Sequence, residues 1–187
     1  MRIALGPQRP RVGVLYTDAE GAGGLGAVFF IEDRAFWFED SAPLAFYQGL
    51  EIRKTQIIPL EALAVLSAIM KFGNMIVGGR ILVFVDNQSV LGALRKGSSP
   101  SQDLLRIVGA VWDEANRLNI QAIFLWVPSA LNIADFPSRA SDPQIPGSSK
   151  VQLGGILAEV SEQLMSKGLG RRPTIGEQAS VATDSGL

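Results

Sequence analysis

Four acidic residues stand where they could take part in chemistry. Asp18 and Asp86 each directly follow a run of apolar residues, whereas Glu61 and Asp135 lie near the start of segments with helical spacing. Taken singly, each has an ordinary structural explanation: a turn for Asp18, a helix cap for Asp86, and a favourable helix dipole or first turn for the other two. Taken together, the four are harder to dismiss.

The two aspartates are expected at one edge of the same sheet. Each follows an apolar strand segment, residues 12–17 and 80–85, and neighbouring strands would point both side chains to an edge where α/β folds often place sites. Converging carboxylates need a cation, because their mutual repulsion otherwise raises at least one pKa and opposes the arrangement. Four acids suit two Mg²⁺ ions about 3.5 to 4 Å apart, a geometry that activates water and stabilises a leaving oxygen. The chemistry indicated is phosphodiester hydrolysis.

The amino-acid composition excludes several other catalytic chemistries and so favours carboxylate groups. The 187 residues include no histidine and no cysteine, which excludes disulfides, thiolate chemistry, Ser-His triads and zinc sites built on those residues. Lys and Arg number 17 against 18 Asp and Glu, so no global positive field attracts a nucleic acid. Residues 1–140 carry 13 basic and 13 acidic groups, and their surface becomes mildly cationic once the four candidate ligands are set aside.

The pattern of apolar residues predicts an α/β fold. Three short strand segments at hairpin spacing predict an antiparallel meander, and two further strands follow, with helices between them. Pro59 opens the first helix, Asn87 can cap the second, and Ser99 or Ser101 can cap the third. The strands are expected at residues 12–17, 25–32, 34–39, 80–85 and 120–127, and the helices at 59–73, 87–96, 101–116 and within 129–140.

The composition changes near Ala140. Residues 12–140 are expected to form the domain, after an N-terminal extension of residues 1–11. Residues 141–150 are typical of a linker, residues 151–167 have the period of an amphipathic helix, and the remainder to residue 187 is expected to be a disordered tail. No cleavable leader and no uncharged stretch of membrane-spanning length is found, so the protein is expected inside the cell, in the cytoplasm or nucleus, and not in a membrane.

Several motifs resemble those of the ribonuclease H family. The stretches YTDA at 16–19 and GGLGAV at 23–28 are similar to the opening hairpin of ribonuclease H, in which the first catalytic Asp ends a strand. The stretch DNQSV at 86–90 is similar to a second catalytic segment of the family. The stretches WVPS at 126–129 and NIADFPSR at 132–139 resemble the end of the ribonuclease H domain in reverse transcriptases of retroelements, of the LTR or DIRS-like kind.

The resemblance implies a fold, an activity and a set of residues. The fold is the α/β ribonuclease H-like fold, a five-stranded mixed sheet of three antiparallel and then two parallel strands, flanked by helices. The activity is that of an endonuclease that cuts the RNA strand of RNA/DNA hybrids with two Mg²⁺ ions, for which Mn²⁺ can substitute. The implied catalytic residues and metal ligands are Asp18, Glu61, Asp86 and Asp135. The implied substrate contacts are Ala19, Asn87, Gln88, Ser129 and Asn132.

The same resemblance implies partners. The substrate is an RNA/DNA hybrid, with Gln88 at its minor groove, where 2′-hydroxyls distinguish RNA from DNA. A reverse-transcriptase polymerase domain, in cis or in trans, would raise the effective concentration of the hybrid, since this domain alone is expected to bind it weakly. No small-molecule cofactor is expected. The loop before Asp135 lacks the histidine that many cellular members carry, which predicts slow turnover.

Two other functions stay open from the sequence. A decayed copy could keep the fold as a nucleic-acid-binding or scaffold module without hydrolysis, although all four acids are present. The protein could instead be a nuclease or transposase of the same fold that acts on DNA, although residues 132–139 favour the ribonuclease H domain of a reverse transcriptase. The tryptophans at 37, 112 and 126 could be imagined as base-stacking platforms, but each lies in a segment of strand or helix period, which favours full or partial burial.

Overall fold

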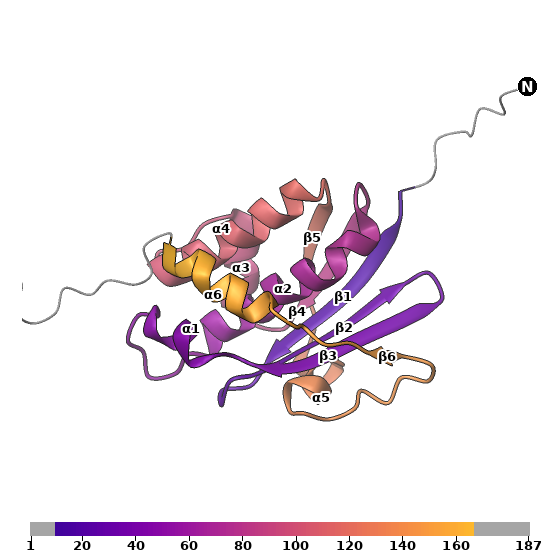
Figure 1. Ribbon diagram of the computed structural model, residues 1–187, viewed down its shortest axis with the longest axis horizontal. Helices are drawn as coiled ribbons and strands as arrows, with labels where there is room; N and C mark the ends of the chain where they lie inside the picture. Colours follow the sequence, from indigo (N-terminus) through magenta and orange to yellow (C-terminus); the bar gives the residue numbers. More distant parts are fainter. Residues whose placement is uncertain (1–9, 167–187) are drawn as a thin grey trace, which may run out of the picture.

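The computed structural model describes residues 10–166, in which a mixed sheet carries helices on both faces (Figure 1). The strands are β1 (Val12–Ala19), β2 (Gly24–Ile31), β3 (Arg34–Ser41), β4 (Arg80–Val85), β5 (Gln121–Trp126) and β6 (Ser149–Lys150). The helices are α1 (Leu44–Gln48), α2 (Ile57–Phe72), α3 (Gln88–Lys96), α4 (Gln102–Arg117), α5 (Asp135–Ser138) and α6 (Ile156–Leu164), with 3₁₀ turns η1 (Gly73–Ile76) and η2 (Ser129–Leu131).

The strand order brings the ends of β1 and β4 together. β1, β2 and β3 form the antiparallel meander that their hairpin spacing predicts, and β4 and β5 continue the sheet in parallel on the other side of β1. The order is β5-β4-β1-β2-β3-β6, with Tyr16 of β1 opposite Phe84 of β4. Because neighbouring parallel strands end at the same edge, Asp18 and Asp86 lie at one edge of the sheet, as predicted.

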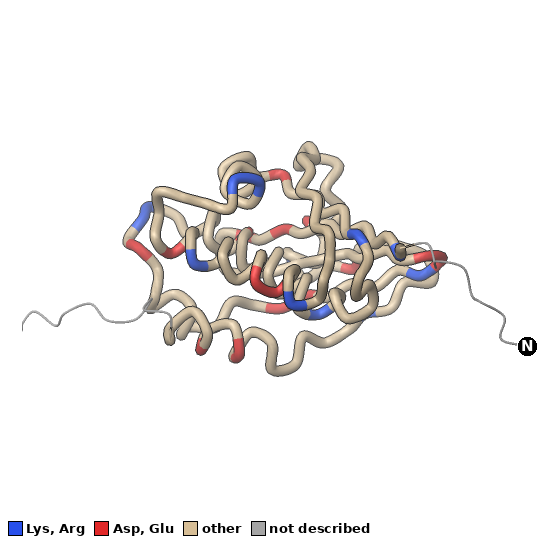
Figure 2. Tube along the Cα trace, turned by 90° about the horizontal axis from the view of Figure 1, so that it is seen from above, with Lys and Arg blue, Asp and Glu red and all other residues tan. Residues whose placement is uncertain are grey.

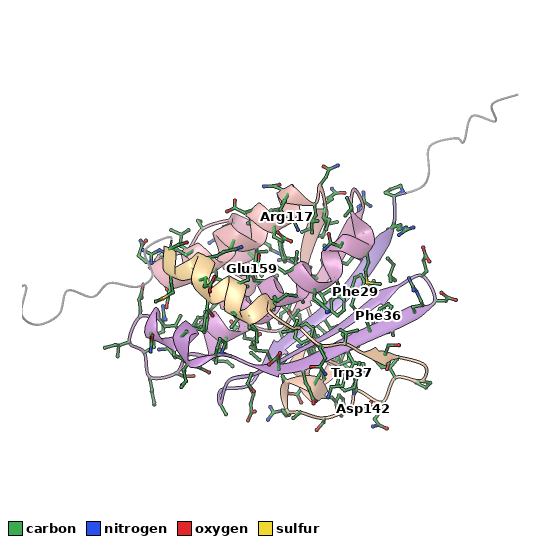
Figure 3. All side chains as sticks on the ribbon, viewed as in Figure 1. Phe29, Phe36, Trp37, Arg117, Asp142 and Glu159 are labelled. Carbon is green, nitrogen blue, oxygen red and sulfur yellow. The ribbon has the colours of Figure 1, made fainter. Side chains whose placement is uncertain are left out.

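α2 and α4 cover one face of the sheet and close the core. Phe29 of β2 stacks on Phe72 of α2 with ring centroids 4.8 Å apart, and Figure 3 shows Phe29 in the layer between the sheet and α2. The segment Ile57–Ile76, which comprises α2 and η1, is long and apolar enough to pass for a membrane-spanning helix by length and composition. Most of it is buried inside the protein, which is typical of a core helix.

The opposite face of the sheet carries α5, which lies directly on the backbone of β2. A Cβ atom on Gly24 or Gly26 would collide with the backbone of Ser138, and one on Gly26 would also come within 2.7 Å of the carbonyl oxygen of Ala134. Gly24 and Gly26 of the GGLG stretch are therefore required for this close approach. The contact sets the position of the helix that begins with Asp135.

The chain after Ala140 returns to the same sheet and the same core (Figure 1). β6 pairs in parallel with β3, and the amide of Val151 donates to the carbonyl oxygen of Trp37 at 2.8 Å, so the sheet has a short sixth strand beyond the five that were expected. α6 then packs on α2. Four apolar side chains of this segment are buried in the core, namely Leu153, Leu157, Val160 and Leu164.

Several element boundaries differ from those expected. The last amphipathic helix begins at Ile156 rather than at residue 151, because Gly154 has a left-handed φ of 64°. Pro59 is the third residue of α2 rather than the first, a place where its missing N–H still costs no intrahelical bond. The helix expected within 129–140 is split into η2 and α5, and α1 was not expected because five residues show no period.

Residues 1–9 and 167–187 lie outside the described residues. The expectations of an N-terminal extension and a disordered tail therefore stay predictions. The expectation that residues 12–140 form the domain without the segment that follows them also stays a prediction.

Candidate metal centre

Three carboxylates from three separate elements meet at the carboxyl edge of the sheet. Asp18 lies near the end of β1, Glu61 in the first half of α2, and Asp86 directly after β4. One oxygen from each lies within 4.8 Å of the other two. Asp18 and Glu61 are buried and Asp86 is half-buried. The structure thus brings together three of the four acids that the sequence singles out.

Burial and mutual repulsion raise the pKa values of two of these carboxylates, Glu61 and Asp18. Burial raises the pKa of Glu61 to about 9, and the negative charges of Asp86 and Asp18 act in the same direction. Burial also raises the pKa of Asp18 to about 6, although a hydrogen bond from Ser138 opposes the shift. A divalent cation between the carboxylates would offset both the cost of burial and the repulsion, and would lower both pKa values.

Two buried oxygens of the cluster lack a hydrogen-bond partner among the described residues. They are one carboxylate oxygen of Glu61 (Oε2) and one of Asp86 (Oδ1). Buried polar atoms in proteins nearly always have partners, and a coordinated cation would satisfy both oxygens. The donors are all carboxylate oxygens, which suit Mg²⁺ or Mn²⁺ better than a softer ion. The residues present therefore fit a divalent metal held by Asp18, Glu61 and Asp86.

Asp135 lies beside this cluster and not within it. It is the first residue of α5, its side chain is 45% exposed, and it accepts a hydrogen bond from Nε of Arg139 at 2.8 Å. Its charge still reaches Asp18, because it contributes to the raised pKa of that carboxyl. The fourth acid of the sequence pattern is thus near the site but engaged in an ion pair.

Three of the five residues expected to contact substrate remain accessible from solvent. Gln88 is the first residue of α3 and Ser129 the first of η2, and both are exposed. Asn87 is half-buried and caps α3 as predicted, since its Oδ1 accepts the amides of residues 89 and 90 at 3.0 and 3.2 Å.

The other two, Ala19 and Asn132, are buried. Asn132 uses both ends of its amide inside the protein: Nδ2 donates to the carbonyl oxygen of Thr17 at 3.0 Å, and Oδ1 accepts the amide of Ala134 at 3.2 Å. The expectation that Asn132 contacts substrate stays a prediction, although both ends of its side-chain amide are already bonded inside the protein. Its amide holds the segment before Asp135 against β1.

Comparisons with known proteins bear on the fold. No family model matches the sequence, and no curated protein matches it significantly. The N-terminal RNase H domain of a Mycobacterium tuberculosis protein, solved as a fusion with maltose binding protein, matches with a TM-score of 0.51 and 17% identity, over 70% of this chain and 98% of that one. RNase H1 from the archaeon Halobacterium salinarum NRC-1 has a TM-score of 0.47 and 16% identity, over 66% of this chain and 89% of its own. LC9-RNase H1 has a TM-score of 0.46 and 15% identity, over 90% of each chain.

The chain has the ribonuclease H fold. This assignment rests on the likeness to the mycobacterial domain together with the mixed sheet described above. It confirms the fold class that the motifs imply, with the short β6 as an addition. Because unrelated functions can share one fold, the activity has to be argued from the site.

Trp126 lies beside the candidate metal site of this ribonuclease H fold. This position was not predicted from the sequence. Its side chain is 48% exposed, and its Nε1 donates to the carbonyl oxygen of Asp86 at 3.2 Å. The expectation of burial is confirmed for Trp37 and Trp112 and is wrong for Trp126. Strand period could not reveal this, because Trp126 is the last residue of β5, an edge strand.

The free energy of unfolding of the metal-free protein is expected to fall as the pH rises. Between about pH 6, above which Asp18 has lost its proton, and about pH 9, folded Glu61 holds a proton that the unfolded chain has released, so stability falls with pH. For one proton the slope is at most about 1.4 kcal/mol per pH unit. Urea unfolding in a chelator at a series of pH values measures it.

Two comparisons test the cause of this pH dependence. Glu61→Gln should flatten the slope, whereas Glu162→Gln, on an exposed part of α6, should leave it unchanged. Saturating Mg²⁺ should restore stability at high pH by binding the ionised cluster. A metal-free parent whose stability stays constant or rises with pH over this range would contradict the assignment of Glu61.

Proposed function

We propose that this protein is a metal-dependent endonuclease that hydrolyses the RNA strand of RNA/DNA hybrids, as the ribonuclease H domain of a retroelement-type reverse transcriptase. The observation that carries the proposal is the meeting of Asp18, Glu61 and Asp86 on a ribonuclease H fold, with buried oxygens that have no partner. A purely structural cluster of this kind would be unfavourable, because burial and repulsion both oppose it.

The chemistry follows from the residues at this edge of the sheet. Asp18, Glu61 and Asp86 would hold the metal, and Asp135 would join them once Arg139 takes another partner such as a substrate phosphate. Two bound Mg²⁺ ions would supply a water nucleophile at neutral pH and charge stabilisation at the leaving oxygen. The chain has no histidine to assist proton transfer or product release, so we expect slow turnover.

A groove beside α3 gives the hybrid a place to lie. Gln88 and Lys96 of α3 line it together with Arg53 and Ser101, and Arg53 is fixed by its ion pair with Asp103. Gln88 follows Asp86 by two residues, so the groove begins close to the carboxylates. The lining is largely apolar, and the side chains in it that suit a sugar-phosphate backbone are Lys96, Gln88 and the serines.

The charges of the described residues are not gathered on one basic face. Figure 2 shows Lys and Arg interspersed with Asp and Glu along the trace. Affinity for a hybrid from this chain alone should therefore be weak and sensitive to salt. We include a polymerase domain, in cis or in trans, in the proposal, because tethering would supply the missing affinity and the stretch at 132–139 resembles that of retroelement reverse transcriptases.

The decisive experiment incubates the purified protein with end-labelled RNA/DNA hybrid, double-stranded RNA and double-stranded DNA. Each substrate is tested with Mg²⁺, with Mn²⁺ and with a chelator. We expect cleavage only of the RNA strand of the hybrid, and none in the chelator. Binding of the hybrid without cleavage would instead indicate an inactive module, and cleavage of DNA would indicate a DNA-acting nuclease or transposase of the same fold.

A further inference from the structure

The hydroxyl of Ser138 reaches a carboxylate of the metal centre from a distant part of the chain. Its Oγ contacts Oδ2 of Asp18, 120 residues away in sequence, and lies 3.0 Å from the carbonyl oxygen of Asp135. A hydroxyl has one proton to donate, and a carboxylate is a stronger acceptor than a carbonyl oxygen. When Asp18 is ionised, the bond is charge-assisted.

We propose that Ser138 is a positioning residue of the metal centre, which fixes the orientation of the Asp18 carboxylate and couples it to the helix that carries Asp135. The inference rests on the proposed function, since it treats Asp18 as a metal ligand. Ser138 is 3% exposed, so its hydroxyl would touch neither substrate nor bulk solvent. Groups that hydrogen-bond to metal ligands in this way orient the ligand, and their loss weakens metal binding.

The backbone around Ser138 is held in place from one side by β2. Gly24 and Gly26 leave no room for a side chain where α5 lies on the strand. An alanine at position 138 would keep this packing, because its Cβ atom is already present in serine. Removal of the hydroxyl therefore tests the bond to Asp18 and not the docking of α5.

The same segment is attached to β1 at two consecutive residues. Asn132 donates to the carbonyl oxygen of Thr17 at 3.0 Å, and Ser138 donates to the side chain of Asp18. The ion pair between Arg139 and Asp135 lies at the outer end of α5. The first bond fixes the start of the segment and the second its end, so the segment with the fourth acid has a defined place beside the first.

A simpler explanation for a serine here is local. Serine hydroxyls often bond the carbonyl oxygen three residues earlier, which would satisfy the end of α5. That bond alone would not place the hydroxyl on a carboxylate of another element. The two explanations differ in consequence, because only the positioning role changes the affinity of the metal centre.

The test compares Ser138→Ala with the parent in two measurements. Titration of Mg²⁺ by calorimetry should show binding weakened by about 10-fold, the low end of the range for loss of such a partner. Hybrid cleavage should show kcat lowered by a similar factor, with KM for the hybrid changed less than about twofold, because Ser138 does not touch substrate. Ser138→Cys keeps a proton donor at this place, although its sulfur is larger than the oxygen and donates a weaker hydrogen bond, and it should fall between the two.

Ser67→Ala is the matched control. It removes another buried serine hydroxyl, from α2, whose Oγ has no partner among the described residues. It should leave Mg²⁺ affinity and kcat at the parental values. Parental Mg²⁺ affinity in Ser138→Ala, or an equal loss in both alanine variants, would overturn the proposal. If the parent binds Mg²⁺ but cleaves no hybrid, the proposed function fails, and calorimetry still decides the role of Ser138.

Discussion

Replacement of Asp86 by asparagine is expected to lower kcat for hybrid cleavage by about 10³-fold or more, the scale at which loss of one group of a preorganised site acts. Asp86 has a buried carboxylate oxygen without a hydrogen-bond partner, at the point where Asp18 and Glu61 converge. An amide has one oxygen and no negative charge, so it should bind a divalent cation poorly. Single-turnover cleavage at saturating Mg²⁺ measures the loss.

The same substitution should not destabilise the metal-free protein. Without the charge of Asp86, repulsion on Glu61 and Asp18 decreases, so thermal unfolding in a chelator should occur at the same or a higher temperature. Asp33→Asn is the control, because it makes the same chemical change in the exposed turn between β2 and β3. Near-parental cleavage by the Asp86 variant would remove Asp86 from the site.

A chain that ends at Ala140 is expected to lose at least about 3 kcal/mol of its free energy of unfolding, a large fraction of the stability of a typical domain. The truncation removes β6 and four buried apolar side chains of the following segment. It also exposes the surface of α2 on which α6 packs, and it leaves the outer edge of β3 unpaired. Urea unfolding followed by circular dichroism measures the change in midpoint.

A chain that ends at Ser166 is the control for this truncation, because it retains every described element. It should unfold at the midpoint of the full chain. An equally stable chain that ends at Ala140 would show that the change in composition marks a true folding boundary, and that α6 is an accessory element.

The ends of the main strands could be predicted, because their apolar runs are bounded by turn and cap residues. β6 could not, since two residues have no period and only pairing with β3 defines them as a strand. The amphipathic stripe of α6 predicts a helix but does not specify its partner, which is α2. Residue periodicity thus predicts most of the helices and strands, whereas contacts between residues distant in the sequence determine which elements pack together.

The candidate site divides in the same way. The positions of Asp18 and Asp86 follow from strand ends. The position of Glu61 near a helix start is explained equally well by the helix dipole, so its role as a metal ligand is implied only by the family resemblance. The ion pair of Asp135 and the bond from Ser138 to Asp18 could not be predicted. Both depend on how closely α5 lies on two glycines of β2, a distance that no local pattern encodes.

The bonds from residues 132 and 138 to β1 span 115 and 120 positions of the chain. During translation, β1 leaves the ribosome long before the segment that anchors it, and contacts of such separation form late in folding. We expect a polypeptide that ends before residue 132 to lack a fully ordered candidate metal centre. Under the proposed function, hybrid cleavage would therefore require that residues 132–138 have been synthesised and have docked on β1.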